Sequence, residues 1–427
     1  MKLKAYSKYK KSGIQWIGDI PEGWSLERFK LRFKSKKGKI PDNLDVTNGE
    51  GYLPYLSMEY LRGKEENAQF SNDPTALKVE DHDLLLLWDG SNAGEFISAK
   101  KGILSSTMVK LNIQRMNTQY CKYLCSGFEP MLRDLTVGMG IPHVNGDVLG
   151  NIQIPIIGIG EQKKATSFLD SKTSQISKTI SADKQLIELL KEKRTALINH
   201  VVTKGLNPKA KMKDSGIEWI GEVPEGWEVK KIKFIGNIVL GKMLTDKEHD
   251  GHIQKPYLRA QNILWEKVDV SDVKEMWFSS GELKRFRLKN NDLLVSEGGE
   301  AGRTALWKGE IDECYIQNSV QKVTLDEGCI PNYFLYLFES YGKRGIFDSV
   351  VSRVSIAHLT REKLKEIICT VPPKQEQAQI AKFLDKATSK IDQTIQKIEA
   401  KIELLEEFKK SLIHHVVTGK VDVRCEI

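Results

Sequence analysis

Apolar residues recur every three or four positions along two stretches of the chain, 161–203 and 376–418. The first stretch runs through Leu169, Thr173, Ile176, Ile180, Asp183, Ile187, Leu190, Arg194, Leu197 and Val201, and the second through Leu384, Thr388, Ile391, Ile395, Ile398, Ile402, Leu405, Lys409, Leu412 and Val416. A period of 3.5 residues sustained over about five heptads is typical of a coiled-coil seam. Neither stretch contains Pro or Gly, so each predicts one helix, about 65 Å long if fully helical.

Two such seams in one chain are most simply buried against each other, as antiparallel helices. Asp183 and Arg194 occupy seam positions where apolar residues are expected. Paired across the helices, these charges could fix the register; a solvated stretch is the alternative.

The segments before each helix, roughly 28–150 and 231–365, follow a different pattern. Short β-rich runs alternate with Gly and Asn turns, which is typical of mixed α/β domains. The runs that predict strands are Asp83–Trp88, Met108–Ile113, Asn291–Ser296 and Val320–Leu325.

The sequence also contains an internal repeat. SGIQWIGDIPEGW, beginning at Ser12, returns as SGIEWIGEVPEGW at Ser215, and close to half of the positions in 161–203 are identical in 376–418. We therefore predict a tandem duplication with pseudo-two-fold symmetry: two globular α/β (mixed α+β) domains joined by two long antiparallel coiled-coil helices. The expected boundaries are 1–152 and 207–367 for the domains with their repeated heads, and 153–206 and 368–427 for the helices and C-terminal tail.

Composition narrows the function classes only slightly. The chain has 65 Lys and Arg against 57 Asp and Glu, a net charge of +8 that permits a polyanionic partner without requiring one. Six scattered cysteines argue against a disulfide scaffold or a structural zinc and suit a reducing cytoplasm. The polar N-terminus and the short aliphatic runs predict neither export nor membrane insertion.

Catalytic motifs are not recognisable. The only Pro-Pro pair is followed by Lys374, which does not suit the base-holding loop of an amino-methyltransferase. The run from Gly236 to Lys242 imitates a phosphate-binding loop, but Met243 stands where a magnesium-binding hydroxyl is needed. We therefore expect no catalytic residues, no metal site and no cofactor bound by this chain.

Three repeated segments carry a specific resemblance. The SGI-x-WIG-x-(I/V)-PEGW head, the E-Q-x5-FLD-x-x-T-S-x-I helix and the IELL…LI-x-HVVT helix end occur twice, in the same order. Over essentially its whole length, the chain resembles the DNA specificity subunit of type I restriction–modification systems. The resemblance implies a non-catalytic, cytoplasmic subunit whose two target-recognition domains each read one half of a split duplex DNA site, with the helices setting their separation.

The resemblance also implies partners. Two methyltransferase (modification) subunits would dock on the repeated elements, and two restriction subunits would join further out. S-adenosylmethionine, and ATP with Mg, would then be bound by those partner subunits. A stand-alone DNA-binding regulator and a two-domain scaffold without enzyme partners are the alternatives from other classes.

Candidate DNA contacts follow from the groups that reach base edges and phosphates. Lys39 and Lys242 share a repeated Gly-Lys pair and suit phosphate contacts. The other candidates are Arg62, Trp88, Asn92, Lys100 and Lys101 in the first domain, and Arg259, Gln261, Asn262, Arg285, Arg287, Arg303 and Arg353 in the second. For each of them, a solvated surface side chain is the competing interpretation. The repeated Trp16, Trp24, Trp219 and Trp227 are either core anchors or a partner-docking surface.

Overall fold

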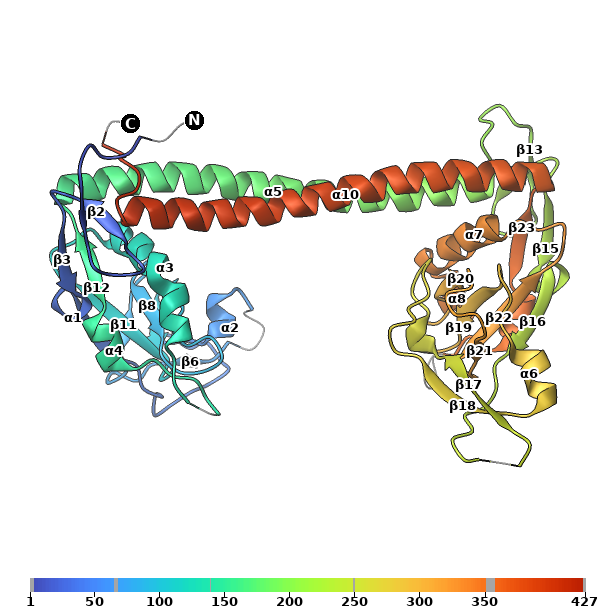
Figure 1. Ribbon diagram of the computed structural model, residues 1–427, viewed down its shortest axis with the longest axis horizontal. Coiled ribbons are helices and arrows are strands. Elements are labelled where there is room, and N and C mark those ends of the chain that lie inside the picture. The colour runs from blue at the N-terminus through green and yellow to red at the C-terminus, as the bar shows by residue number, and fades with distance from the viewer. Residues whose placement is uncertain (1–3, 65–67, 139, 249, 351–357, 425–427) are drawn as a thin grey trace. The chain divides into compact units, whose positions relative to one another are not determined.

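The computed structural model describes residues 4–64, 68–138, 140–248, 250–350 and 358–424. The chain forms two compact units, one of Met1–Asp183 with Glu399–Ile427 and the other of Lys184–Ile398. Two long helices, α5 (Ile159–Lys204) and α10 (Lys374–Val417), each give one half to each unit (Figure 1). Both predicted helices are therefore confirmed.

The predicted seam is also confirmed, because each of its twenty positions is buried or half-buried. The two charged residues of its first stretch each form an ion pair with α10 of their own unit. Asp183 forms an ion pair with Lys401 at 2.8 Å in the first unit, and Arg194 one with Asp392 at 3.1 Å in the second. In the first unit Lys409 also donates to Ser177, so residue numbers fall along α5 as they rise along α10 and the two helix halves run antiparallel.

The first unit contains two four-stranded sheets and two short ribbons. One sheet has the order β4 (Phe33–Lys37), β11 (Met108–Ile113), β8 (Leu84–Leu87), β9 (Phe96–Ser98); the other has β6 (Phe70–Ser71), β5 (Leu53–Leu56), β10 (Gly102–Leu104), β7 (Lys78–Val79). The ribbons pair β1 (Tyr9–Lys11) with β2 (Asp19–Pro21), and β3 (Ser25–Arg28) with β12 (Gln153–Ile156). The shorter helices are α1 (Phe29–Arg32), α2 (Met58–Leu61), α3 (Thr118–Asp134) and α4 (Gly146–Asn151).

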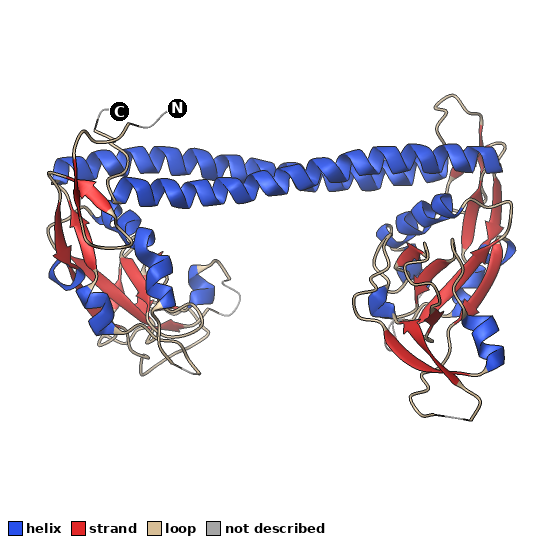
Figure 2. Ribbon diagram, viewed as in Figure 1, coloured by secondary structure: helices blue, strands red, loops and turns tan. Residues whose placement is uncertain are grey.

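The second unit repeats this plan (Figure 2). Its sheets have the orders β16 (Gly236–Leu240), β22 (Val320–Leu325), β19 (Leu293–Ser296), β20 (Thr304–Leu306), and β18 (Lys274–Phe278), β17 (Ile253–Leu258), β21 (Tyr315–Ile316). The ribbons pair β13 (Met212–Asp214) with β14 (Glu222–Pro224), and β15 (Glu228–Lys231) with β23 (Ile368–Val371). Its shorter helices are η1 (Ile232–Phe234), η2 (Ala260–Asn262), α6 (Ser280–Phe286), α7 (Pro331–Lys343), α8 (Ile346–Val350) and α9 (Arg361–Glu366).

The four strand predictions agree with the structure. Those over Met108–Ile113 and Val320–Leu325 match β11 and β22 residue for residue, and the other two lie over β8 and β19. The phosphate-loop imitation at Gly236 proves to be strand β16, where a Cβ on this glycine would approach the carbonyl oxygen of Thr324 to 2.5 Å. The strand has no room to wrap a phosphate, and the nucleotide interpretation is dropped.

The repeated helix motif anchors each long helix to its own domain. The side-chain oxygen of Gln162 accepts a hydrogen bond from the backbone N–H of Asn117, the N-cap of α3, at 2.7 Å. Gln377 accepts one from Ile330, the N-cap of α7, at 2.8 Å. One motif therefore ties the start of a long helix to the start of a domain helix in both units.

The aspartates of the FLD triplets make a second tie. The hydroxyl of Tyr123 on α3 donates to Asp170 at 2.6 Å, and the hydroxyl of Tyr336 on α7 donates to Asp385 at 2.9 Å. Each such hydrogen bond contributes about 1 kcal/mol. The repeated polar residues of these helices thus have a structural explanation that does not involve DNA.

Candidate nucleic-acid interface

Three loops meet at one edge of the first domain: the ends of β4, β8 and β10. The backbone N–H of Gly38 donates to the carbonyl of Met108, and that of Trp88 donates to the carbonyl of Thr107. The hydroxyl of Tyr55 accepts a hydrogen bond from the N–H of Ser106. Loops held by main-chain hydrogen bonds on a sheet scaffold are where binding residues usually lie.

The second domain builds the same edge from the ends of β16, β19 and β21. Here the N–H of Gly241 donates to Val320, and the N–H of Glu297 donates to Ser319. The two edges therefore share one backbone frame and carry different side chains. This is the arrangement expected of two DNA-binding domains that recognise different half-sites.

The repeated Gly-Lys pair has a steric cause. A Cβ on Gly38 would lie 2.2 Å from the carbonyl oxygen of Ser105, and one on Gly241 would lie 2.3 Å from that of Gln317. Only glycine allows the two loops to approach this closely. The recurrence of glycine in both repeats therefore has a structural explanation, and only the lysine of each pair is a candidate for DNA contact.

The two lysines differ in availability. Lys39 has a half-exposed side chain whose ammonium lies 3.6 Å from a carboxylate oxygen of Asp73. The side chain of Lys242 is only 10% exposed and pairs with Glu282 at 2.7 Å. The ammonium of Lys39 also donates to Thr75, so both lysines would exchange internal partners for a phosphate, and Lys39 is the more exposed of the two.

The candidates of the first domain gather around α2 and the β8–β9 loop, with one exception. Arg62 pairs with Glu95 of that loop at 2.9 Å, and Lys100 lies over the ring of Tyr60, 5.0 Å from its centroid. Trp88 and Asn92 are half-buried in the same loop. The exception is Lys101, which is exposed and lies 3.7 Å from Glu80.

Four candidates of the second domain lie together where β17 ends. Arg259 and Gln261 both bind the carboxylate of Asp272, at 2.9 and 3.1 Å. The guanidinium of Arg303 donates to the carbonyl of Ala260 at 3.1 Å. These three side chains are held in place by acceptors of the same unit.

Asn262 stands apart from this group because it is buried, with 2% of its surface exposed. Its amide donates to the carbonyls of Asp269 and Asp272, and its oxygen accepts from the N–H of Arg259. This side chain organises the loop and presents nothing to a base, so we leave it out of the interface.

The remaining candidates lie near α6. Arg285 and Arg287 are both exposed, and the guanidinium of Arg285 lies 5.3 Å from the ring centroid of Phe286. Arg353 lies outside the described residues. Arg285 also lines a hollow of about 640 Å³ together with Lys242, Glu297 and Arg361.

Two exposed histidines were missed by the sequence reasoning. His143 and His358 precede Val144 and Leu359, whose N–H groups donate to the carbonyls of Trp88 and Glu297 at the edges described above. The signal was available, since the same offset of 215 residues that relates the long helices relates these histidines.

The repeated tryptophans divide into two pairs. Trp24 and Trp227 are 4% and 1% exposed, so they are core anchors. Trp16 and Trp219 are half-buried and pack edge-on or tilted against Phe128 and Tyr341. Of the four, only Trp16 and Trp219 keep surface that a partner could touch.

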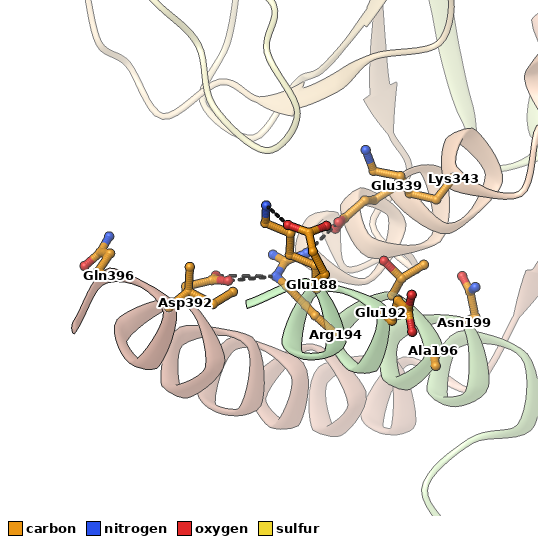
Figure 3. Close-up of a pocket in the computed structure, with 12 residues that line it drawn as sticks. Glu188, Glu192, Arg194, Ala196, Asn199, Glu339, Lys343, Asp392 and Gln396 are labelled. Atoms are coloured by element: carbon orange, nitrogen blue, oxygen red, sulfur yellow. Dashed lines mark hydrogen bonds and ion pairs between the residues drawn. The ribbon is translucent and has the colours of Figure 1, made fainter. Parts of the chain in front are cut away.

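A buried ion cluster joins the long helices to the second domain (Figure 3). Arg194 of α5, 13% exposed, contacts Glu266 at 2.5 Å, Glu339 of α7 at 2.6 Å and Asp392 of α10 at 3.1 Å. Burial and the neighbouring Glu266 raise the pKa of Glu339 to about 7, although Arg194 opposes the rise. Arg194, Glu339 and Asp392 line a hollow of about 730 Å³.

The cluster also reaches the interface loops. The carboxylate of Glu266 accepts a hydrogen bond from Arg194, and its backbone N–H donates to the carbonyl of Thr304 at 2.9 Å. The indole N–H of the neighbouring Trp265 donates to the carboxylate of Glu300 at 2.7 Å. Both Thr304 and Glu300 border the β19–β20 loop that carries Arg303. A side chain of the long helix thereby fixes the position of a candidate reading loop.

Within the described ranges, no group of three or more His, Cys, Asp or Glu side chains is arranged to hold a metal ion. Nor does any described helix have the length and apolar character needed to cross a membrane.

Comparisons with known proteins address the family directly. A family model described as "Type I restriction modification DNA specificity domain" matches residues 21–189 and 224–404. The MjaVIII specificity subunit of Methanocaldococcus jannaschii is 30% identical over 95% of this chain and 94% of its own. The EcoKI specificity subunit of Escherichia coli strain K12 is 22% identical over 68% of this chain and 62% of its own.

Solved structures share the fold. A chain from a structure of the assembly and conformational transition of a type I restriction–modification system matches with a TM-score of 0.72 at 12% identity, covering 94% of this chain and 99% of the other. The HsdS subunit from Thermoanaerobacter tengcongensis matches with a TM-score of 0.53 at 13% identity, over 94% and 98%. Two matches of the family model, one in each repeat, and a full-length relative agree with the duplicated fold and with a non-catalytic role: the chain belongs to the family of DNA specificity subunits of type I restriction–modification systems.

Proposed function

We propose that this chain reads a two-part duplex DNA site, with one half read by the loop edge of each domain. The observation that carries the proposal is the shared backbone frame of the two edges, on which the side chains differ. The alternatives of a stand-alone regulator and a scaffold without enzyme partners are disfavoured by the specificity subunits named among its relatives.

Phosphate contacts would come from the cations that remain exposed at these edges. Lys39 in the first domain and Arg285 and Arg287 in the second are the best placed. Arg62 and Arg259 can exchange a carboxylate for a phosphate, because one partner of each ion pair remains open to solvent: Arg62 is 48% and Asp272 64% exposed. The same pairs hold the guanidinium groups in place before DNA arrives.

The test measures binding of the chain with its methyltransferase partner to duplexes over a range of salt concentrations. Each phosphate contact contributes about −0.9 to the slope of log K against log salt. Lys39→Gln and Arg285→Gln should each reduce the slope by about one, whereas Lys209→Gln, an exposed lysine outside the loops, should not. Binding by the unaltered complex that ignores both salt and sequence would contradict the proposal.

We also propose that two methyltransferase subunits dock on the repeated elements. What supports this is a pair of exposed leucines at equivalent helix positions, Leu189 on α5 (60% exposed) and Leu404 on α10 (65% exposed). Duplicated apolar positions suit two copies of one partner. S-adenosylmethionine would be bound by those subunits, and ATP with Mg by two restriction subunits.

Docking is tested by measuring the mass of the intact complex. Two methyltransferase subunits per chain are expected, and Leu189→Glu together with Leu404→Glu should release both. Leu186→Glu is the matched control, since Leu186 is also exposed but its repeat counterpart is Lys401. A complex with one methyltransferase per chain would refute this stoichiometry.

A further inference from the structure

One residue position at the loop edge is fixed in the same way in both domains. In the first, it is Trp88, directly after β8: its N–H donates to Thr107 at 2.8 Å, and its carbonyl accepts from Val144 at 2.9 Å. The peptide on either side of the residue is therefore held by a different segment. The side chain has a defined starting direction without help from its own contacts.

In the second domain, the same position is occupied by Glu297, directly after β19. Its N–H donates to Ser319 at 2.9 Å, and its carbonyl accepts from Leu359 at 2.8 Å. The two hydrogen bonds match those of Trp88 in partner segment and in length. Trp88 and Glu297 are thus structural equivalents, and the sequence agrees, since each lies five residues after the aspartate of a matched Asp-Leu-Leu triplet, Asp83 and Asp292.

The Glu297 carboxylate is poorly provided for in the free protein. The residue is half-buried and borders the hollow of about 640 Å³, yet among the described residues its carboxylate has no hydrogen bond or ion pair. The nearby ammonium of Lys242 is bound to Glu282 instead. Burial raises the pKa of the Glu297 carboxyl, and His358 opposes that rise.

A half-buried carboxylate that has no donor from the protein can exchange water for a donor that a ligand supplies. In the major groove, the exocyclic amino group of cytosine offers such a donor, and Glu and Asp are the side chains that accept from it. The surrounding Arg285 and Arg361, which line the same hollow, suit the phosphates beside such a base. Trp88 offers no acceptor; its ring is half-buried against the core of the first unit, and the exposed part would contact a base through apolar surface.

We propose that Glu297 is a specificity-determining residue of the second domain, accepting a hydrogen bond from the amino group of one cytosine, and that Trp88 occupies the equivalent base-facing place in the first domain. This inference rests on the proposed function, since it assigns chemistry to one position of the interface described there. It predicts that one base pair in the second half-site depends on a single carboxylate.

The test selects preferred duplexes from a randomised library, using the whole chain bound to its methyltransferase partner. Glu297→Gln should change the preference at one base pair of the second half-site, away from cytosine, and leave the first half-site unchanged. Affinity for the original site should fall about 5- to 150-fold, the range of a single good base contact of 1–3 kcal/mol. Trp88→Gln should alter the first half-site only.

The controls separate the possible failures. Glu310→Gln changes an exposed carboxylate in the turn after β20 and should leave both half-sites as they are. Thermal unfolding of Glu297→Gln should match that of the unaltered chain closely, because the carboxylate makes no hydrogen bond or ion pair within the described residues. If Glu297→Gln selects the original site with unchanged affinity, the inference is overturned. If the unaltered complex selects no sequence, the proposed function itself fails.

Discussion

Replacing Arg194 with Met should destabilise the second unit in a way that depends on pH. The change leaves Glu339, which is 4% exposed, without its cationic partner. Breaking a buried ion pair by removing one member costs about 3–5 kcal/mol when the other stays charged. Glu339 can avoid much of this cost by binding a proton, because its pKa already lies near 7.

The sign follows from the direction of that shift. A carboxyl whose pKa is raised on folding binds more protons in the folded state, so stability falls as pH rises toward the folded pKa. Removing Arg194 removes an interaction that lowers the pKa of Glu339, so the pKa rises further. Each additional unit adds about 1.4 kcal/mol of destabilisation above that pKa. The loss should therefore be about 1–2 kcal/mol at pH 6, where Glu339 is largely protonated and the loss comes from hydrogen bonds and from the partly exposed pairs with Glu266 and Asp392. At pH 8 it should be about 3 kcal/mol or more.

Urea unfolding at pH 6 and pH 8, followed by tryptophan fluorescence, measures both values. Lys409→Met is the matched control: this repeat counterpart of Arg194 is half-buried, and its ammonium donates to Ser177 at 2.8 Å. It should cost less than about 1 kcal/mol at either pH. Adding Glu339→Gln to Arg194→Met should remove most of the pH dependence. Equal losses at both pH values, or an equal loss in Lys409→Met, would refute the reasoning.

Three further outcomes are expected. Exchanging residues 28–150 for the corresponding segment of a relative should change one half-site only, because the seam of the helices lies outside that segment; mapping of methylated adenines would show it, and changes in both halves would argue against modular reading. Trp24→Phe should lower the melting temperature more than Trp227→Phe, since the indole of Trp24 donates to Glu161 at 3.2 Å and that of Trp227 has no partner among the described residues. Four residues inserted after Lys178 lengthen α5 by about 6 Å, so the preferred DNA spacer between the two half-sites should grow by one or two base pairs. An unchanged spacer in an active protein would show that the length of α5 does not set the distance between the half-sites.

The long helices and the duplication could be predicted because both leave a periodic record in the sequence. Seam positions such as Leu169 recur at each helical turn and are buried, so they favour apolar residues. Trp24 recurs as Trp227 because the two residues occupy equivalent positions in the two cores. Burial in a regular element constrains residue type, so pattern alone identifies the element. The same reasoning located β11 and β22, whose residues are largely buried.

The interface was harder to predict because its side chains are constrained by loop geometry. Asn262 has the residue type of a base reader, yet a 3₁₀ turn directs its amide into three backbone groups of its own loop. Lys242 has a matching lysine in the first repeat, but α6 supplies Glu282 to neutralise it. Glu297 aligns with Trp88 through the matched Asp-Leu-Leu triplets at Asp83 and Asp292, but the sequence does not show that main-chain hydrogen bonds fix both residues at the loop edge.

The duplication has also drifted at one apolar position of the repeated helix motif. Phe168 is 4% exposed and shares a core with Val421 and Val423 of the C-terminal segment, all within the first unit. Its repeat counterpart, Phe383, is 42% exposed and borders a hollow of about 780 Å³ beside Leu206, the counterpart of Val421.

The same apolar position is thus covered in one unit and open in the other. Two identical partner subunits docking near these positions would meet surfaces of unequal apolar area, and unequal area favours unequal affinity. A symmetric repeat therefore does not imply symmetric binding: the first and second partner subunits should bind this chain in two distinguishable steps.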